Sequence, residues 1–275
     1  MSVYSYLGPA GTFTEAALTP ILKPGDKAVP AVNVTAALDA VRSGSAEYAI
    51  VPIENSVEGV VARTLDELAS GEPLLIIGES ILAVSFALMV KPGVKISEIK
   101  KLATHPHAEA QCREYISKNI PGAEVIMTAS TAAGAEAVAK GEADGALAAA
   151  VAAKNFNLEI IAEDVGDRQA AVTRFVTVSR PGKIAAPTGS DRSSLVVFID
   201  ADHSGALLEI LTEFAVRGVN LTFIQSRPTG LELGHYHFII DAEGHIADAS
   251  VKEAVESLRA ICEDIRFLGS YPREK

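Results

Sequence analysis

Four short segments of the sequence bring together residue types that can bind or activate a small polar substrate. They carry hydroxyl, amide and imidazole groups, and they are GPAGTFTEAA (8–17), PIENSVEGVV (52–61), HPHAEAQCREY (105–115) and VTRFVTVSR (172–180). Each adjoins a run that we expect to form a strand, and ligand sites in α/β folds lie where strands end and helices begin. Backbone amides and an arginine in such places can hold a carboxylate.

The first two segments place polar groups just before an expected helix. In the first, two glycines allow close approach of the backbone to a ligand, and Thr12 and Thr14 supply hydroxyl groups. A capped turn without a ligand fits the same residues. In the second, Glu54, Asn55 and Ser56 crowd hydrogen-bonding groups together. An N-cap cluster is the alternative there.

The third segment contains two histidines and a cysteine. His105 and His107 suggest a metal, but no third ligand follows at a useful spacing, so we expect no metal site. Gln111 and Cys112 fall on the following helix. We expect Cys112 to be packed rather than nucleophilic, because no adjacent base is identifiable.

The fourth segment begins with Thr173 and Arg174 and continues as an apolar strand. Neighbouring residues of a strand point to opposite faces, so both side chains reach one site only if the backbone is irregular there. An ordinary edge strand is the alternative.

Strands and helices alternate along most of the chain, which indicates an α/β architecture. We expect two lobes with a cleft between them. Strands are expected at 3–7, 28–32, 48–53, 74–90 (broken), 101–104, 124–127, 145–148, 159–164 and 173–179, and helices at 13–22, 34–43, 60–70, 107–118, 131–140 and 149–155.

A stretch rich in proline and glycine, 179–190, marks a connector between two domains, 1–182 and 191–275. After it the order becomes β-α-β-β-α-β, which is typical of a ferredoxin-like domain. The expected strands are 194–200, 220–226, 235–241 and 265–271, and the expected helices are 205–217 and 250–262.

Composition and charge exclude several classes of protein. Hydrophobic residues make up 48% of the chain, but no run is long enough to span a membrane. The net charge of −11 leaves no basic face for nucleic acid. The N-terminus enters a strand directly, so we expect no secretory signal. Two distant cysteines fit reduced thiols in a cytoplasmic protein.

In order and approximate spacing, GPAGTF, ENSVEGVV, HPHAEAQC and TRF resemble the prephenate dehydratase family. In the second domain, GALLEIL (205–211) and QSRP (225–228) resemble the phenylalanine-binding elements of an ACT regulatory domain. The resemblance extends from Val3 to Tyr271. It implies a catalytic domain like a two-lobed periplasmic binding protein, followed by a ferredoxin-like ACT domain.

Three positions depart from the family's usual pattern. Gln225 stands where the family has an acid, and Leu208 ends a GALL that is usually GALV. Ala171 takes the place of a common asparagine before the TRF threonine. The first two positions concern the affinity for an effector, and the third concerns the active site.

The resemblance implies decarboxylative dehydration of prephenate to phenylpyruvate, in phenylalanine biosynthesis, with no cofactor. It gives Thr173 the role of hydrogen-bond donor to the departing hydroxyl, and gives Arg174 the role of anchoring a carboxylate or bracing the site. The remaining catalytic positions are Asn55, Ser56 and Glu54. The substrate-binding positions are Thr12, Phe13, Gln111 and Phe175, although the two phenylalanines also fit as packing beneath the loops.

The resemblance also implies that L-phenylalanine binds between paired regulatory domains of a homodimer or homotetramer. The effector-binding positions are Gly205, Ala206, Leu207, Leu208, Asn220, Gln225, Ser226, Arg227 and Pro228. A ferredoxin-like domain that only dimerises is the alternative. For the whole chain, arogenate dehydratase and a non-catalytic two-lobed binding protein with a sensor domain remain open.

Overall fold

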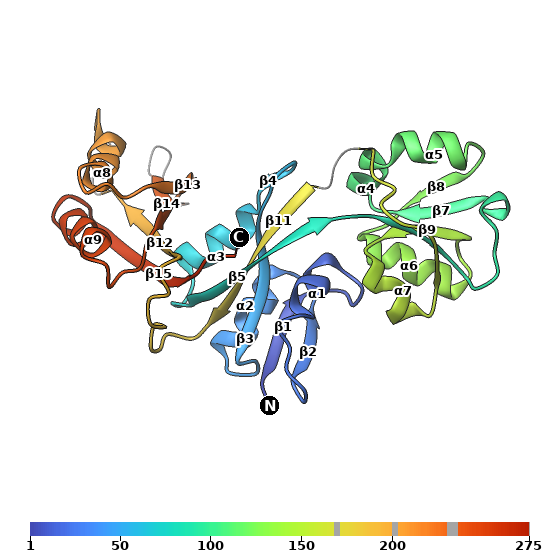
Figure 1. Ribbon diagram of the computed structural model, residues 1–275, viewed down its shortest axis with the longest axis horizontal. Helices are drawn as coiled ribbons and strands as arrows, with labels where there is room; N and C mark the ends of the chain where they lie inside the picture. Colours follow the sequence, from blue (N-terminus) through green and yellow to red (C-terminus); the bar gives the residue numbers. More distant parts are fainter. Residues whose placement is uncertain (168–170, 200–202, 230–235, 275) are drawn as a thin grey trace.

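The protein is described by a computed structural model that covers residues 1–167, 171–199, 203–229 and 236–274. Three β-sheets follow one another along its longest axis (Figure 1). The N-terminal sheet lies in the middle, the second sheet at one end and the C-terminal sheet at the other. None of the helices in these ranges is long and apolar enough to cross a bilayer.

The central sheet has the strand order β2-β1-β3-β11-β5, and the short strand β4 pairs with β3. β1 is parallel to β2 and β3, whereas β11 returns antiparallel between β3 and β5. The strands are β1 (Val3–Leu7), β2 (Lys27–Ala31), β3 (Tyr48–Asn55), β4 (Gly59–Val60), β5 (Leu75–Val84) and β11 (Ala171–Ser179). The helices are α1 (Phe13–Leu18), α2 (Val34–Arg42) and α3 (Ala62–Ser70).

Helix α2 illustrates why these segments fold as they do. The side chain of Asn33 accepts a hydrogen bond from the N–H of Ala36 and so caps the helix start. Val34, Leu38 and Val41 lie on one face at helical spacing, and all are buried against the sheet. The alternation of such helices with β-branched strands produces the parallel part of the sheet.

The second sheet has the order β10-β6-β9-β7-β8, with β7 parallel to β8 and β9. Its strands are β6 (Ala87–Val90), β7 (Lys101–Thr104), β8 (Glu124–Met127), β9 (Gly145–Ala148) and β10 (Glu159–Ala162). Its helices are η1 (Ile96–Glu98, a 3-10 turn), α4 (Pro106–Gln111), α5 (Arg113–Asn119), α6 (Thr131–Lys140) and α7 (Ala150–Phe156).

The chain passes between the first two sheets twice, from β5 to β6 and from β10 to β11. The expected break in the strand 74–90 is therefore confirmed, and the two sheets form two lobes (Figure 1). The single helix expected at 107–118 is wrong. It is two helices, α4 and α5, that meet at Cys112, whose dihedral angles are not helical.

The C-terminal sheet has the order β13-β14-β12-β15, and all its neighbours are antiparallel. Its elements are β12 (Asp191–Phe198), α8 (Ala206–Ala215), β13 (Leu221–Pro228), β14 (Tyr236–Glu243), α9 (Ala249–Ile261) and β15 (Asp264–Pro272). This is the expected β-α-β-β-α-β order, although residue 200 of the first expected strand and residue 235 of the third lie outside the described residues.

One face of the C-terminal sheet packs on the central sheet rather than standing free. Val196, Ile239, Leu268 and Tyr271 are buried in the same apolar cluster as the side chains of α2, α3 and β3. A Cβ atom on Gly269 would lie 2.1 Å from the carbonyl oxygen of Ile76 on β5, so β15 approaches β5 at backbone distance. The connector therefore joins two segments that share one hydrophobic core.

Candidate active site

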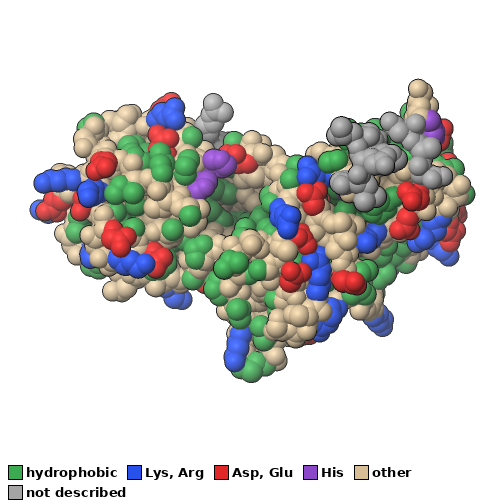
Figure 2. Space-filling model, turned by 180° about the vertical axis from the view of Figure 1, so that it is seen from behind, with side chains coloured by type: hydrophobic (Ala, Val, Ile, Leu, Met, Phe, Trp, Pro, Cys, Tyr) green, Lys and Arg blue, Asp and Glu red, His purple; other side chains and the backbone are tan. Residues whose placement is uncertain are grey.

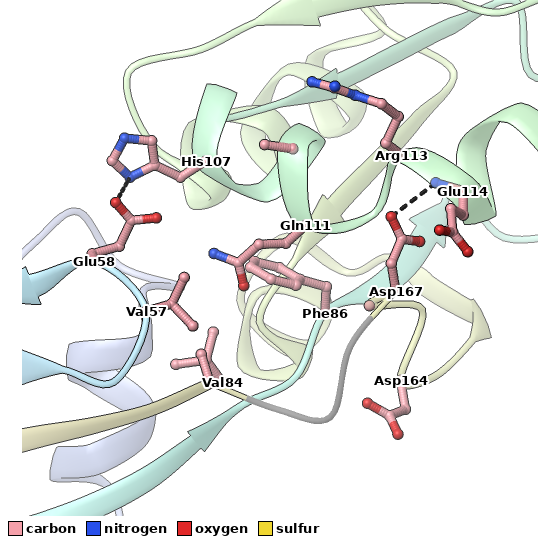
Figure 3. A pocket seen from close by; sticks show the side chains of 13 residues that line it. Val57, Glu58, Val84, Phe86, His107, Gln111, Arg113, Glu114, Asp164 and Asp167 are labelled. Carbon is pink, nitrogen blue, oxygen red and sulfur yellow. Dashed lines mark hydrogen bonds and ion pairs between the residues drawn. The ribbon is translucent and has the colours of Figure 1, made fainter.

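Two adjoining cavities lie between the first two lobes. The larger has a volume of about 500 Å³ and the smaller about 280 Å³. Both are lined by Glu58 from the central lobe and by Phe86, His107 and Gln111, on the side of the second lobe. Figure 3 shows the larger cavity, and Figure 2 shows histidine side chains at the edge of the hollow between the lobes.

Thr173 and Asn55 form a hydrogen-bonded pair on the wall of the smaller cavity. They are directly opposite each other on β11 and β3, and the Asn55 Nδ2 atom lies 2.7 Å from the Thr173 Oγ1 atom. The Asn55 Oδ1 atom accepts the backbone N–H groups of Val57 and Glu58 at 2.8 and 2.9 Å. Because Oδ1 accepts two bonds, the amide must donate to Thr173.

The hydroxyl hydrogen of Thr173 is consequently left for another acceptor. Thr173 is 7% exposed, and in the described part of the chain its hydroxyl donates no hydrogen bond. A neutral hydroxyl held in place by one incoming bond can donate to a group in the cavity without changing its protonation state.

Ser56 supports this pair from outside the cavity. Its Oγ atom accepts the N–H of Val172, and its own N–H donates to the carbonyl of Val172, both at 2.9 Å. The side chain is exposed and does not line either cavity. Ser56 therefore fastens the end of β11 to the loop after β3.

Three further expected positions, Thr12, Phe13 and Gln111, meet at the smaller cavity. Thr12 is the N-cap of α1, and its hydroxyl donates to the carbonyl of Leu7 at 3.1 Å. The Phe13 ring packs edge-on against Phe86, with ring centroids 5.5 Å apart. The expected substrate-binding role of Phe175 does not fit, because this ring is 2% exposed and packs with Tyr6 and Leu18 in the core of the central lobe.

Arg174 does not reach the cavity, so its expected role as a carboxylate anchor for the substrate does not fit. It is 4% exposed, and its guanidinium group contacts Glu54, Glu79 and Asp241. Glu54 likewise faces Arg174, with 2.6 Å between the Arg174 Nε and Glu54 Oε1 atoms. Thr173 and Arg174 pair in one register with Asn55 and Glu54 and serve opposite faces of β11, and the pairing with β3 becomes irregular only after Arg174. The other expected role, bracing the site, agrees with this placement.

Glu58 is a cleft residue that the sequence analysis did not single out. Its carboxylate lies 3.4 Å from the His107 Nδ1 atom across the gap between the lobes (Figure 3). Its place in the second polar segment (52–61) could have indicated a role in the site. Its partner His107, however, comes from the third segment, on the other lobe. The pair connects the lobes when His107 is protonated.

The two histidines themselves are neighbours, with ring centroids 4.9 Å apart in an edge-on arrangement. Burial lowers the pKa of His105, the charge of His107 lowers it further, and Glu58 opposes both effects. Within the described residues, no group of three or more His, Cys, Asp or Glu side chains is placed to hold a metal ion.

Cys112 is fully buried among apolar side chains, as expected for a packed residue. Burial, together with the nearby Asp167 and Glu109 carboxylates, raises the pKa of its thiol to about 12. A thiol so far from its reactive thiolate form is a poor nucleophile at neutral pH.

In the C-terminal domain, the expected effector positions lie around the start of α8 and along β13. Gly205 caps α8 with a φ angle of +100°, which favours glycine, and Ala206 is buried. Leu207 and Leu208 are 36% and 66% exposed. The Gln225 amide donates to the carbonyl of Ser226 at 2.9 Å. Asn220 and Pro228 are exposed.

Arg227 is committed to a different partner. Its Nε and Nη2 atoms each lie 2.8 Å from the carboxylate oxygens of Asp66 on α3, in a bidentate ion pair between the two domains. An effector-binding role for Arg227 would require this pair to open, so the structure places Arg227 at the domain interface.

Comparison with known proteins identifies the family. The prephenate dehydratase family model matches residues 4–183, and the ACT domain model matches residues 193–260. The prephenate dehydratase of Amycolatopsis methanolica is 47% identical over 274 residues, which covers 99% of this chain and 89% of that protein.

Two solved structures superpose over nearly the whole chain. One is a prephenate dehydratase from Arthrobacter aurescens in complex with L-Phe, with 48% identity, a TM-score of 0.91, and coverage of 98% of this chain and 90% of that one. The other is described as a quorum quenching acylase, with 29% identity, a TM-score of 0.89, and coverage of 99% and 98%. The family-model matches and the near-50% identity over full length decide the assignment: the chain belongs to the prephenate dehydratase family of lyases and carries a C-terminal ACT domain.

Proposed function

We propose that the protein converts prephenate to phenylpyruvate, carbon dioxide and water, with the Thr173 hydroxyl as the donor to the departing ring hydroxyl. The observation that supports this most is the Asn55–Thr173 hydrogen bond, because its direction leaves the Thr173 hydrogen at the cavity wall without an acceptor among the described residues. The electrons released with carbon dioxide make the ring aromatic as the hydroxyl leaves, and the departing oxygen takes one proton from solvent to become water. A preorganised donor at the leaving oxygen lowers the barrier to that step.

Arg113 is the one lysine or arginine among the described residues that line the larger cavity, where it stands with four acidic residues (Glu58, Glu114, Asp164 and Asp167). Its pairing with Glu109 at 3.3 Å leaves it 70% exposed, so it is the described cation that can meet the carboxylate that the product retains. The smaller cavity is bordered by Ser130 and Thr131 at the start of α6, where N–H groups and the helix dipole favour an anion. Because Arg174 points elsewhere, none of the described residues that line the smaller cavity places a guanidinium group beside Thr173, where the carboxylate must leave.

Residues 1–182 carry catalysis in this proposal, and residues 191–275 bind L-phenylalanine as an allosteric effector of phenylalanine biosynthesis. The Arthrobacter aurescens relative is a complex with L-Phe, which supports the choice of effector. The exposed Leu207 and Leu208 near the start of α8, and the edge strand β13, suit pairing of two such domains, in a homodimer or homotetramer. A cytoplasmic location fits the two free cysteines.

The test is turnover by the purified protein, with prephenate and arogenate as separate substrates and with or without L-phenylalanine. We expect phenylpyruvate from prephenate at a higher kcat/KM than phenylalanine from arogenate, and a changed rate when L-phenylalanine is present. Preference for arogenate would reassign the substrate. Tight prephenate binding without turnover would make the chain a two-lobed binding protein.

A further inference from the structure

The strand pair that carries the catalytic candidates has two chemically different faces. On the face toward the cavity, Thr173 of β11 bonds Asn55 of β3. One residue along each strand, on the opposite face, Arg174 pairs with Glu54. Directly opposed residues of two strands move together, so whatever fixes Arg174 and Glu54 also fixes the neighbouring pair.

Arg174 is held from the C-terminal domain. Its Nη2 atom lies 2.7 Å from the Asp241 Oδ2 atom on β14, at an angle that makes the contact an ion pair rather than an aligned hydrogen bond. The guanidinium carbon lies 5.5 Å from the ring centroid of Phe223 on β13. Two strands of the C-terminal sheet thus contact a side chain that is adjacent in sequence to Thr173.

Asp241 is itself fixed within the C-terminal sheet. Its Oδ1 atom accepts the Ser194 hydroxyl at 2.5 Å, and the Ser194 Oγ atom lies 2.8 Å from the Tyr271 hydroxyl. Asp241, Ser194 and Tyr271 are each no more than 1% exposed. The carboxylate position is therefore set by β12 and β15, not by solvent.

Glu79 on β5 completes this buried cluster. Its Oε2 atom lies 3.4 Å from Arg174 and 2.5 Å from Arg192 of β12. Burial by itself lowers the pKa of Arg174, but the nearby carboxylates, with Asp241 foremost, raise it above its ordinary value. A buried guanidinium group that loses a carboxylate partner moves toward the remaining ones, because an uncompensated charge is costly in the interior.

We propose that Asp241 is a positioning residue for the reaction: it holds Arg174, and through Arg174 the strand pair that presents Thr173 and Asn55 to the cleft. This inference rests on the proposed function. It makes the C-terminal domain part of the support of the active site, and it gives that domain a direct contact through which a change in its position alters turnover.

The experiment compares Asp241→Asn with the unaltered full-length protein. The substitution keeps the shape of the side chain. It leaves the two guanidinium groups of the cluster, Arg174 and Arg192, with the carboxylates of Glu54 and Glu79. The variant thus avoids a net buried charge. We expect kcat for prephenate to fall by roughly tenfold to a hundredfold, the scale of a small misplacement of a reacting group, with little change in KM.

The matched control is Glu243→Gln, the same chemical change on the same strand. Glu243 pairs with Arg273 inside the C-terminal domain and does not touch Arg174. We expect its kcat to equal that of the unaltered protein. Unfolding midpoints measured in parallel, and assays well below them, separate loss of position from loss of folded protein.

A double-substitution cycle with Thr173→Val decides between positioning and a general structural role. If Asp241 acts by placing Thr173, Asp241→Asn causes no further loss of kcat once the hydroxyl is gone. Equal proportional losses in both backgrounds, or an unchanged kcat in Asp241→Asn, would overturn the inference.

A second variant covers the case in which Asp241→Asn does not fold. Ser194→Ala removes the hydroxyl that holds Asp241 but keeps every charge of the cluster. We expect kcat to fall less than in Asp241→Asn, and not to fall further when Thr173→Val is already present. An unchanged kcat in Ser194→Ala would contradict the proposal. Failure of the proposed function is a separate result, since the unaltered protein would then show no prephenate turnover.

Discussion

Three donors decide what the Thr173 hydroxyl can do. The N–H groups of Val57 and Glu58 fix the Asn55 carbonyl oxygen, and this forces the Asn55 amide to donate to Thr173. A threonine that must accept from its neighbour has one hydrogen left, and the cavity is where it can go. Asn55 therefore orients the Thr173 hydroxyl so that its hydrogen points toward the cavity.

Removing the Thr173 hydroxyl takes away this donor. Thr173→Val keeps the shape of the side chain, and we expect kcat for prephenate to fall by roughly a hundredfold or more, the scale of one lost transition-state donor. Thr173→Ser should retain much of the activity. Thr177→Val is the control, because Thr177 is an equally buried threonine of the same strand that lines neither cavity. Normal turnover by Thr173→Val would show that the donor is another group.

The pairing of β3 with β11 brings the residues of the candidate site together. The sequence was enough to predict both strands, and to predict that Thr173 and Arg174 face opposite ways. It could not give the register that sets Thr173 against Asn55, because these residues are 118 positions apart. The same limit explains why a contact with substrate does not fit Phe175 and Arg174, whereas their alternative roles, packing and bracing, agree with the structure. Their type suits a ligand, but their burial depends on which sheet covers them.

β15 of the C-terminal sheet lies against β5 of the central sheet at backbone distance. Gly269 has a φ angle of +138°, and an added Cβ atom would meet the Ile76 carbonyl oxygen at 2.1 Å. The β15 backbone therefore has no room for any side chain at this position.

We expect Gly269→Ala to lower the free energy of unfolding by about 2 kcal/mol or more, because backbone strain adds to a forced separation of the strands. Gly93→Ala is the control, since its φ angle of +85° carries a similar backbone cost and no described residue lies within 4 Å of the added atom. Urea unfolding of the unaltered protein and of both variants measures the two losses in the free energy of unfolding. Equal losses would mean that the strand contact contributes nothing.

At the scale of the whole molecule, the cores of the two lobes hold ionisable groups in their neutral form. Burial raises the pKa of Cys112 from 9.0 to about 12, and that of Tyr6 from 10.0 to about 12. The unfolded chain releases these protons at lower pH than the folded chain. Their stabilising contribution is therefore complete below pH 9 and is lost as the pH rises toward 12.

We accordingly predict that the free energy of unfolding falls between about pH 9 and about pH 12. Urea unfolding curves across this range measure it. Cys112→Ala should make the free energy of unfolding depend less steeply on pH, because it removes one of the two buried groups. It also leaves a small cavity. A flat profile would mean that these groups titrate alike in the folded and unfolded chains.

The C-terminal domain shares a core with the central lobe and contacts it through the buried cluster around Arg174, which a connector rich in proline and glycine did not suggest. Arg227 pairs with Asp66, and Arg266 donates to the carbonyl groups of Leu68 and Gly71 at the end of α3. Binding an effector on this domain can change turnover only if the effector binds two arrangements of the interface with different affinity.

The effector proposal predicts a selective loss in Gly205→Val. No atom of the described residues lies within 4 Å of the added Cβ position, so we expect the side chain to obstruct the space beside Leu208 rather than the fold. We expect basal turnover to stay largely intact while the response to L-phenylalanine is lost. Gly189→Val, in the connector, carries similar φ strain and also meets no atom of the described part of the chain within 4 Å, so it controls for strain alone. The measurement is turnover against L-phenylalanine concentration for all three proteins. Equal inhibition of Gly205→Val and the unaltered protein would place the phenylalanine site in the catalytic cleft instead.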